Sequence, residues 1–234
     1  MSINDKVCGE FPNFCYRAFD KKEYAEAFVS QGSFRMNCFG YYRKMQDELR
    51  RDPTEGYGHT IEPDTVNVAH VSSDPQYKTT WVKEKGYKEH KMVRGSRIFC
   101  LCTCLPHVDC THMTKDFGKY IVKINEPKIL AEDINDYFIT KGQKFLIEGC
   151  NVVYSKGQKL TKKLTNKERA DLVYKQKPEV FSANCEFRIV ALEIGKFCEE
   201  ECKYVDGQAE PVCQFLEINL NKRLGYLSLE EQEN

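Results

Sequence analysis

The alternation of hydrophobic and polar positions predicts a strand, a helix and a second strand near the start of the chain. The segment NFCYRAF, residues 13–19, alternates with the period of a strand. The next segment offers Asp20 as a helix N-cap, Glu23 three residues later and Gly32 as a stop. In SFRMNCF, residues 33–39, apolar side chains recur at every second position, which is typical of a strand with one buried face.

The rest of the chain continues this mixture of strands and helices. Strands are predicted at residues 97–104, 118–125, 143–149, 151–155, 184–193 and 213–220. Helices are predicted at residues 127–142, ended by Gly142, and at residues 164–177, capped by Thr165, with a shorter helix that turns into a loop within residues 41–60. Strand-like stretches at residues 65–71 and 79–83 cannot be ordered from the pattern alone.

Together with the composition, this pattern predicts a fold class. A chain of 234 residues that is 41% hydrophobic can bury a full core, so we expect one α+β domain over residues 1–228 and a disordered acidic tail over residues 229–234. Thirty-five basic residues balance thirty-five acidic ones. The chain therefore has no net charge that would attract it to nucleic acid as a whole. The sequence has neither a long apolar run nor a signal peptide at its start, so we expect a cytoplasmic protein with no membrane partner.

The cysteines are the most unusual feature of the composition. There are twelve, and CLCTCLPHVDCTH, residues 100–112, holds four of them with two histidines. A reducing cytosol disfavours disulfides. In a strand Cys100, Cys102 and Cys104 share one face, and burial as small apolar residues is the favoured interpretation, ahead of a zinc site or a catalytic thiol. The zinc ligands of that alternative are Cys104, His107, Cys110 and His112.

Charged residues concentrate in two further places. In NCEFRIVAL, Glu186 and Arg188 lie on the side of the strand opposite to its apolar face, which leaves either a solvated edge or a ligand cleft. In YYRKMQDELRRDPTEG, three arginines lie on a helix that leads into a loop, which is either a solvated surface or a phosphate-binding segment.

A third concentration is basic and suggests nucleic acid. Between Lys156 and Lys177 lie eight basic residues against two acidic ones, an excess of six that the neutral total conceals. A solvated helix explains this run as well as phosphate contacts do. With Tyr154 and Tyr174 nearby as stacking platforms, single-stranded nucleic acid is a reasonable ligand. The residues expected to contact it are Lys162, Lys163 and Lys167.

The order of these features resembles the diverse ADP-ribosyltransferase-like toxins of bacterial toxin–antitoxin and phage-defence systems, including DarT-type enzymes and related abortive-infection proteins. The shared features run from about residue 12 to residue 192. They are the pair Tyr16 and Arg17, the helix-to-strand segment GSFRMNCF, an arginine-rich segment closing in D-P-T-E-G, the strand CLCTC and a late strand with glutamate in E-F-R-I.

The resemblance implies a fold, an activity and a site. The fold is an ADP-ribosyltransferase-like split β-sheet core with flanking helices, and NAD is the substrate. The activity is mono-ADP-ribosyl transfer to nucleic acid, with single-stranded RNA as the expected acceptor and an antitoxin protein or chaperone as the neutralising partner. Glu186 is the expected catalytic carboxylate, with Arg51 as the leading arginine. The residues expected to bind NAD are Tyr16, Arg17, Tyr42, Arg43, Arg50 and Thr103.

The sequence also departs from the family pattern. Either Tyr16 or Arg17 fills the first-strand position, and Thr103 is flanked by cysteines where serines are usual. Two alternatives stay open: a non-enzymatic, zinc-stabilised module that binds nucleic acid or protein, and a toxin that hydrolyses NAD. For the enzyme, Glu186→Ala is expected to abolish transfer while leaving folding intact.

Overall fold

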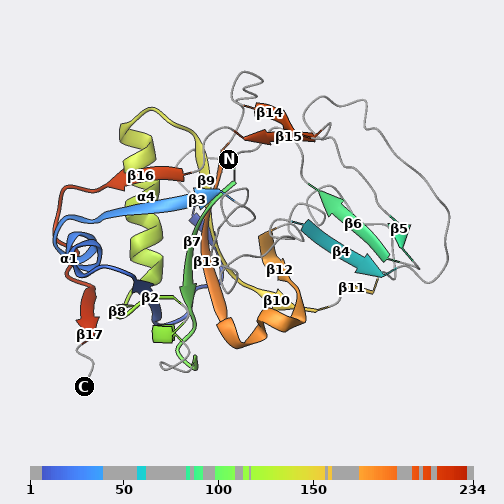
Figure 1. The fold of residues 1–234 in the computed structure, drawn as a ribbon. Coiled ribbons are helices and arrows are strands. Elements are labelled where there is room, and N and C mark those ends of the chain that lie inside the picture. Colours follow the sequence, from blue (N-terminus) through green and yellow to red (C-terminus); the bar gives the residue numbers. More distant parts are fainter. Residues whose placement is uncertain are drawn as a thin grey trace.

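The computed structural model describes residues 7–38, 57–61, 83–84, 87–91, 98–108, 113–115, 117–155, 158–159, 174–193, 202–205, 208–211 and 215–230. Within these residues the chain forms a nine-stranded mixed sheet, two α-helices and three smaller sheets (Figure 1). The α+β class expected from the sequence is therefore confirmed. The four-stranded sheet lies to one side of the nine-stranded one (Figure 1).

The elements have the following bounds. The nine-stranded sheet consists of β1 (Val7–Gly9), β2 (Cys15–Phe19), β3 (Ser33–Cys38), β7 (Ile98–Cys104), β8 (Tyr120–Ile124), β9 (Phe145–Asn151), β13 (Glu186–Glu193), β16 (Phe215–Asn219) and β17 (Leu227–Glu230). The smaller sheets consist of β4 (Tyr57–Ile61), β5 (Lys83–Glu84), β6 (Tyr87–Lys91) and β11 (Gln158–Lys159); of β10 (Val153–Tyr154) and β12 (Gln176–Lys177); and of β14 (Cys202–Val205) and β15 (Gln208–Pro211). The helices are α1 (Lys22–Gln31), α4 (Pro127–Thr140) and the 3-10 helix η1 (Glu179–Asn184).

The large sheet forks at β7. One edge of β7 pairs along its whole length with β13. On the other edge, Cys104 pairs with Tyr16 of β2, whereas Phe99 and Cys100 pair with β3. The strands β2, β8 and β17 therefore form one arm and the strands β3 and β16 form the other, with residues 101–103 of β7 at the point where the arms separate.

Helix α1 connects the two arms and sets the distance between them. It follows β2 directly and ends at Gly32, whose φ of 63° is in the left-handed region that glycine tolerates. A Cβ atom on Gly32 would lie 2.8 Å from the Cβ atom of Leu220, so the close approach of this residue, which directly follows β16, also requires glycine here. The predicted end of the helix at Gly32 is thereby confirmed. Strand β3 begins at the next residue, on the other arm of the fork.

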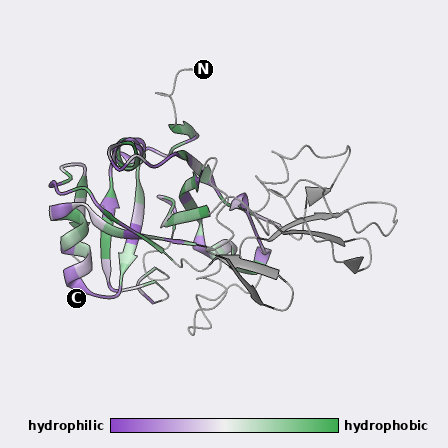
Figure 2. Ribbon diagram, turned by 90° about the horizontal axis from the view of Figure 1, so that it is seen from above, coloured by the Kyte–Doolittle hydropathy of each residue, from purple (hydrophilic) through white to green (hydrophobic). Residues whose placement is uncertain are grey.

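One hydrophobic cluster joins both helices to the sheet. Phe28 of α1, Phe138 of α4 and Phe187 of β13 all belong to it, and all are buried. The rings of Phe138 and Phe145 are stacked at 4.1 Å. Figure 2 shows hydrophobic residues along the strands of the large sheet, with hydrophobic and hydrophilic residues alternating along the helices, as amphipathic helices on a core require.

The central strand β13 is buried on both faces over residues 186–191. Phe187 and Ile189 face the cluster beneath the helices, whereas Val190 packs with Cys100 and Tyr174 on the other face. That other face also carries Glu186 and Arg188, whose exposed fractions are 5% and 0%. The solvated-edge interpretation of this charged pair is therefore wrong.

Several predicted boundaries need correction. The N-cap of α1 is Lys21 and not Asp20, and no side chain caps this helix end. Gln176 and Lys177, predicted as the end of a helix, form strand β12. Strand β17 runs through Glu230, so the predicted tail begins two residues too early, and residues 231–234 lie outside the described part. The predicted helix within residues 41–60 also falls almost entirely outside it.

Candidate functional site

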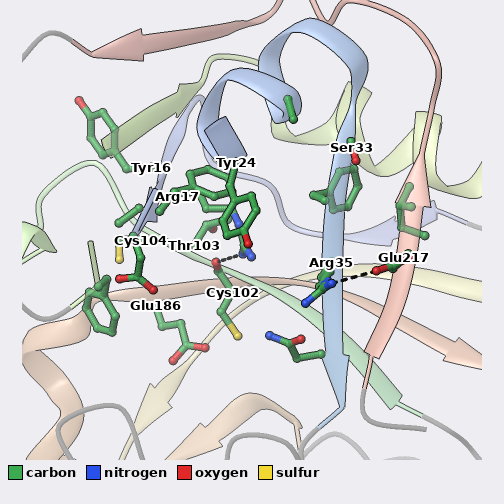
Figure 3. A pocket seen from close by; sticks show the side chains of 18 of the residues that line it. Tyr16, Arg17, Tyr24, Ser33, Arg35, Cys102, Thr103, Cys104, Glu186 and Glu217 are labelled. Carbon is green, nitrogen blue, oxygen red and sulfur yellow. Dashed lines mark hydrogen bonds and ion pairs between the residues drawn. The ribbon is translucent and has the colours of Figure 1, made fainter. Parts of the chain in front are cut away.

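A cavity of about 520 Å³ occupies the fork of the sheet. Its volume falls within the range of small-molecule sites in proteins. Tyr16 and Arg17 line it from one arm and Arg35 from the other, while Thr103 and Glu186 line it from the central strands. Figure 3 shows Tyr16, Arg17 and Glu186 on one side of the cavity and Ser33, Arg35 and Glu217 on the other. The cavity exists because β2 and β3 leave β7 in different directions.

Arg17 closes the point of the fork. Its Nη1 donates a hydrogen bond of 2.8 Å to the carbonyl oxygen of Cys102, in the part of β7 that lies between the two arms. Its guanidinium also lies over the ring of Phe19, 5.3 Å from the centroid. The Nε atom is buried, and the part of the chain that the structure describes gives it no hydrogen-bond partner. A buried donor without an acceptor is costly, so this N–H favours any acceptor atom that a bound ligand brings to it.

Glu186 is held at the cavity wall by two cations. Its Oε1 accepts a hydrogen bond of 2.7 Å from Nε of Arg188, and its Oε2 accepts one of 2.9 Å from Nζ of Lys177. The side chain is only 7% exposed. The backbone N–H of Glu186 donates to the hydroxyl of Tyr154 at 2.8 Å, which fixes the start of β13 as well. Both the backbone and the carboxylate of this residue are therefore anchored.

These partners decide the charge of Glu186. Burial is the largest single influence on its pKa and would raise it, because a carboxylate loses hydration inside the protein. The positive charges of Arg188 and Lys177 together outweigh burial and hold the pKa of Glu186 well below its ordinary value. The group is an anion at neutral pH, in a place where an isolated carboxyl group would be driven towards neutrality.

Two other residues predicted to contact NAD, Thr103 of β7 and Tyr16 of β2, line the cavity but differ in what they offer a ligand. Thr103 is buried, and its hydroxyl donates to the carbonyl oxygen of Phe187 at 2.8 Å. The hydroxyl proton of Thr103 is therefore already used in a hydrogen bond within the sheet. Tyr16 is half-buried and lies edge-to-face with Phe14, their ring centroids 5.6 Å apart. Tyr16 therefore lines the cavity while its ring packs against Phe14 and points away from the centre of the cavity in Figure 3.

The cysteines of β7 line one face of the strand, as the alternation predicted. Cys100 and Cys104 are buried, and Cys102 is half-buried beside Glu186. Burial raises the pKa of Cys104 well above its ordinary value and that of Cys150 to about 12, so neither is a thiolate at neutral pH. Burial, the favoured interpretation of the cysteine stretch, is confirmed for Cys100 and Cys104.

The zinc alternative receives no support from the described residues. His107 is exposed, and Cys110 and His112 lie outside the described part of the chain. Among the residues that the structure describes, no group of three or more histidine, cysteine, aspartate or glutamate side chains is arranged to hold a metal ion.

Sequence reasoning missed several residues of the cavity wall. Tyr24 of α1, which the sequence pattern did not mark as a site residue, lines the cavity and is 54% exposed. Arg35 and Glu217 form an exposed ion pair of 3.0 Å across β3 and β16. Lys177 was counted in a basic run and not as a partner of Glu186. In the sequence, the only sign that Lys177 could be a partner of Glu186 was its position nine residues before that glutamate.

Other predicted site residues fall outside the described part of the chain. They are Tyr42, Arg43, Arg50 and Arg51 of the arginine-rich segment, and Lys162, Lys163 and Lys167 of the basic run. The structure therefore brings together Tyr16, Arg17, Thr103 and Glu186 around one cavity.

Comparison of the chain with protein-family models, with curated proteins and with solved structures finds no match. None of the described helices is long and apolar enough to cross a membrane. The chemistry of the cavity is therefore what remains to be interpreted.

Proposed function

We propose that this protein is a mono-ADP-ribosyltransferase that binds NAD in the fork of the sheet. The observation that carries the proposal is a buried, ionised carboxylate, Glu186, at the wall of a ligand-sized cavity that Arg17 also lines. A split sheet with this cavity in its fork is also what the resemblance to ADP-ribosyltransferase-like toxins leads one to expect.

The reaction breaks one bond and forms one. The bond between the nicotinamide nitrogen and C1′ of its ribose breaks, and nicotinamide leaves with the bonding electrons. An oxygen or nitrogen atom of the acceptor forms the new bond to C1′ and releases its proton. As the first bond breaks, positive charge builds on the ribose, as in glycoside hydrolysis. A carboxylate fixed beside this charge stabilises the transition state more than the ground state.

Glu186 has the capacity for this role despite its two cationic partners. A carboxylate accepts about four hydrogen bonds. Among the described residues, Arg188, Lys177 and the thiol of Cys102 use three of these positions. One position is left for a ligand hydroxyl, such as a ribose hydroxyl of NAD. The anion is thus already oriented before the substrate binds, which lowers the cost of reorganisation.

Arg17 and Tyr16, on the same side of the cavity as Glu186, supply further binding groups. The Nε–H of Arg17 suits an oxygen of the NAD pyrophosphate or ribose, because guanidinium groups bind such oxygens well. The ring of Tyr16 suits stacking on the nicotinamide ring. The arginine-rich segment would add further pyrophosphate contacts, with Arg51 as the leading candidate.

The acceptor and the biological setting remain part of the proposal. The basic run suits a nucleic acid, and we propose single-stranded RNA as the acceptor. The activity would be that of a cytoplasmic toxin or phage-defence protein controlled by a neutralising protein. With water as the acceptor, the same cavity would instead hydrolyse NAD to ADP-ribose and nicotinamide.

Incubation with NAD labelled in its adenosine part, together with separate pools of RNA, DNA and protein, tests this proposal. We expect the label to appear covalently on RNA. Release of free ADP-ribose without labelled macromolecule identifies the hydrolase instead. If NAD is not consumed with any pool, the transferase assignment is wrong, and stoichiometric zinc in that protein supports the non-enzymatic module.

Two buried glutamates provide the matched variants for the same assay. Glu186→Gln keeps the shape of the side chain and removes its charge, and we expect it to abolish transfer. Glu148 of β9 is also buried but does not line the cavity, so Glu148→Gln should retain activity per folded molecule. Removing Glu186 leaves Lys177 and Arg188 buried without their anion, which argues against the expectation that Glu186→Ala leaves folding intact. Both variants therefore need a measurement of the folded fraction.

A further inference from the structure

Two lysines at the end of the basic run reach two different glutamates. Nζ of Lys175 lies 2.5 Å from Oε1 of Glu148, and Nζ of Lys177 lies 2.9 Å from Oε2 of Glu186. The side chain of Lys175 is 28% exposed, whereas that of Lys177 is 9% exposed. Only the second pair lines the cavity in the fork.

Lys177 is held in place from several sides. Its residue pairs with Tyr154 in the two-stranded sheet of β10 and β12, and its carbonyl oxygen accepts a hydrogen bond from the N–H of Ser155 at 3.0 Å. Its ammonium group lies over the ring of Phe181 in η1, 5.2 Å from the centroid. The lysine therefore approaches Glu186 from a fixed backbone, and its side chain rests on a fixed ring.

The two cations around Glu186 do different things. Arg188 lies two residues farther along the same strand, is fully buried, and also donates from Nη1 to the carbonyl oxygen of Tyr174 at 3.0 Å. It binds Oε1 from inside the protein. Lys177 binds Oε2 and itself lines the cavity. The orientation of the carboxylate at the cavity wall thus depends on a lysine that comes from a different strand.

We propose that Lys177 is a positioning residue that holds the Glu186 carboxylate as an anion at the wall of the cavity. A carboxyl group as buried as this one becomes neutral unless nearby positive charge opposes the loss of hydration. A neutral carboxyl group stabilises a ribosyl cation poorly. The use of this anion in transfer rests on the proposed function, but the charge state of Glu186 can be measured without any activity.

The other ionisable groups near Glu186 leave this role to the two cations. Arg17 also lines the cavity and is positively charged, but its guanidinium donates to the carbonyl oxygen of Cys102 and not to Glu186. The described groups that interact with the charge of Glu186 from the surrounding strands, besides the two cations, are Cys102 and Cys104 of β7, Cys150 of β9 and Tyr154 of β10. Burial raises the pKa of Cys104 and of Tyr154 well above their ordinary values and that of Cys150 to about 12, so these three are neutral between pH 4 and pH 8.

The first test measures the charge of Glu186 directly, by nuclear magnetic resonance of the full chain labelled with ¹³C at glutamate carboxyl groups. The resonance of Glu186 is assigned by its loss in Glu186→Gln. In the wild type we expect no protonation between pH 4 and pH 8. In Lys177→Met, where Arg188 is the only cation that opposes the effect of burial, we expect protonation of Glu186 to begin within this range. An unchanged resonance in Lys177→Met overturns the proposal.

The second test reads the pH dependence of NAD consumption. In Lys177→Met we expect kcat/KM to fall about tenfold for each pH unit below the new pKa, a limb that the wild type lacks. Lys177→Arg should restore the wild-type profile, because it returns the positive charge. Lys175→Met removes a cation from Glu148 and not from Glu186, so it should add no such acidic limb to the pH profile, whatever its effect on the overall rate. A uniform loss of rate at all pH values in Lys177→Met indicates a merely structural role and contradicts the proposal.

These two tests also separate the two proposals. A wild-type protein that consumes no NAD removes the proposed function, while the carboxyl titration still decides the role of Lys177. If Lys177→Met does not fold, Lys177→Gln keeps a hydrogen-bond donor without the charge, and the same titration shift is expected there. A folded Lys177→Gln protein with the wild-type titration also overturns the inference.

Discussion

Two buried glutamates on the same face of the large sheet differ in what surrounds them. Glu148 of β9 lies opposite Val190 of β13, and it binds the hydroxyl of Tyr174 at 2.7 Å and the half-buried Lys175. Glu186 binds two cations, of which one is fully buried, and borders the cavity. One carboxylate is thus stabilised away from the cavity, and the other is stabilised at its wall.

This difference favours a role of the buried charge of Glu186 in ligand binding. Replacing a buried ion pair by apolar residues is often neutral or stabilising, so an ion pair in the core is weak evidence for stability. A buried carboxylate held by two cations at the wall of the fork is costly to maintain, and a role in the cavity would explain why it is there. Glu148 provides the comparison because it has the same chemistry without the cavity.

The largest expected difference between the two glutamates is in stability. Glu186→Gln leaves Lys177 and Arg188 buried without an anion, and we expect the free energy of unfolding at pH 7 to fall by about 3–5 kcal/mol. Glu148→Gln keeps the tyrosine hydrogen bond, and Lys175 can reach water, so a loss of about 1 kcal/mol is expected. Urea denaturation measures both values. Equal losses in the two variants contradict the distinction.

The two arms of the fork provide a second comparison, with a smaller effect. Arg17→Met removes the hydrogen bond to the Cys102 carbonyl oxygen at the point of the fork, and we expect a loss of about 1–3 kcal/mol in the free energy of unfolding. Arg35 pairs with Glu217 on the other arm, where both side chains are more than half exposed, so Arg35→Met should cost less than about 1 kcal/mol. Denaturant unfolding of the two variants checks this order, and a costlier Arg35→Met would refute it.

The smallest expected effect is in the pH dependence of stability. The pKa of Glu186 is lowered in the folded protein, so its stabilising contribution is complete above the unfolded pKa and is lost as the pH falls through the folded pKa. The stability difference between wild type and Glu186→Gln should therefore be constant from pH 7 to about pH 5. With an unfolded pKa of about 4.3, it should shrink by about 0.7 kcal/mol at pH 4. A difference that grows on acidification would show a raised pKa.

Much of the fork could be predicted from local sequence patterns. The alternation in residues 33–38 and 98–104 predicted two strands whose buried faces the structure confirms, and Gly32 marked the end of α1. Glu186 was placed on the face of its strand opposite to Phe187, as observed. These predictions succeeded because alternation and glycine stops act over a few residues.

The burial of Glu186 and the partners of Arg17 could not be predicted in the same way. Alternation shows that Glu186 leaves the apolar face, but β12 covers the other face, and Lys177 was expected in a helix. The cavity arises because one strand pairs with β2 near Cys104 and with β3 near Cys100, which is a matter of register between segments far apart in the chain. Tyr24 was missed because the periodicity of a helix does not show which of its residues border a cavity.

A crystal structure of the protein with an NAD analogue that resists cleavage tests the central claim most directly. The account predicts the ligand in the fork, with a ribose hydroxyl within about 3 Å of a Glu186 carboxylate oxygen and the ring of nicotinamide near Tyr16. A ligand bound elsewhere, with the fork empty and Glu186 contacting only Lys177 and Arg188, would contradict it.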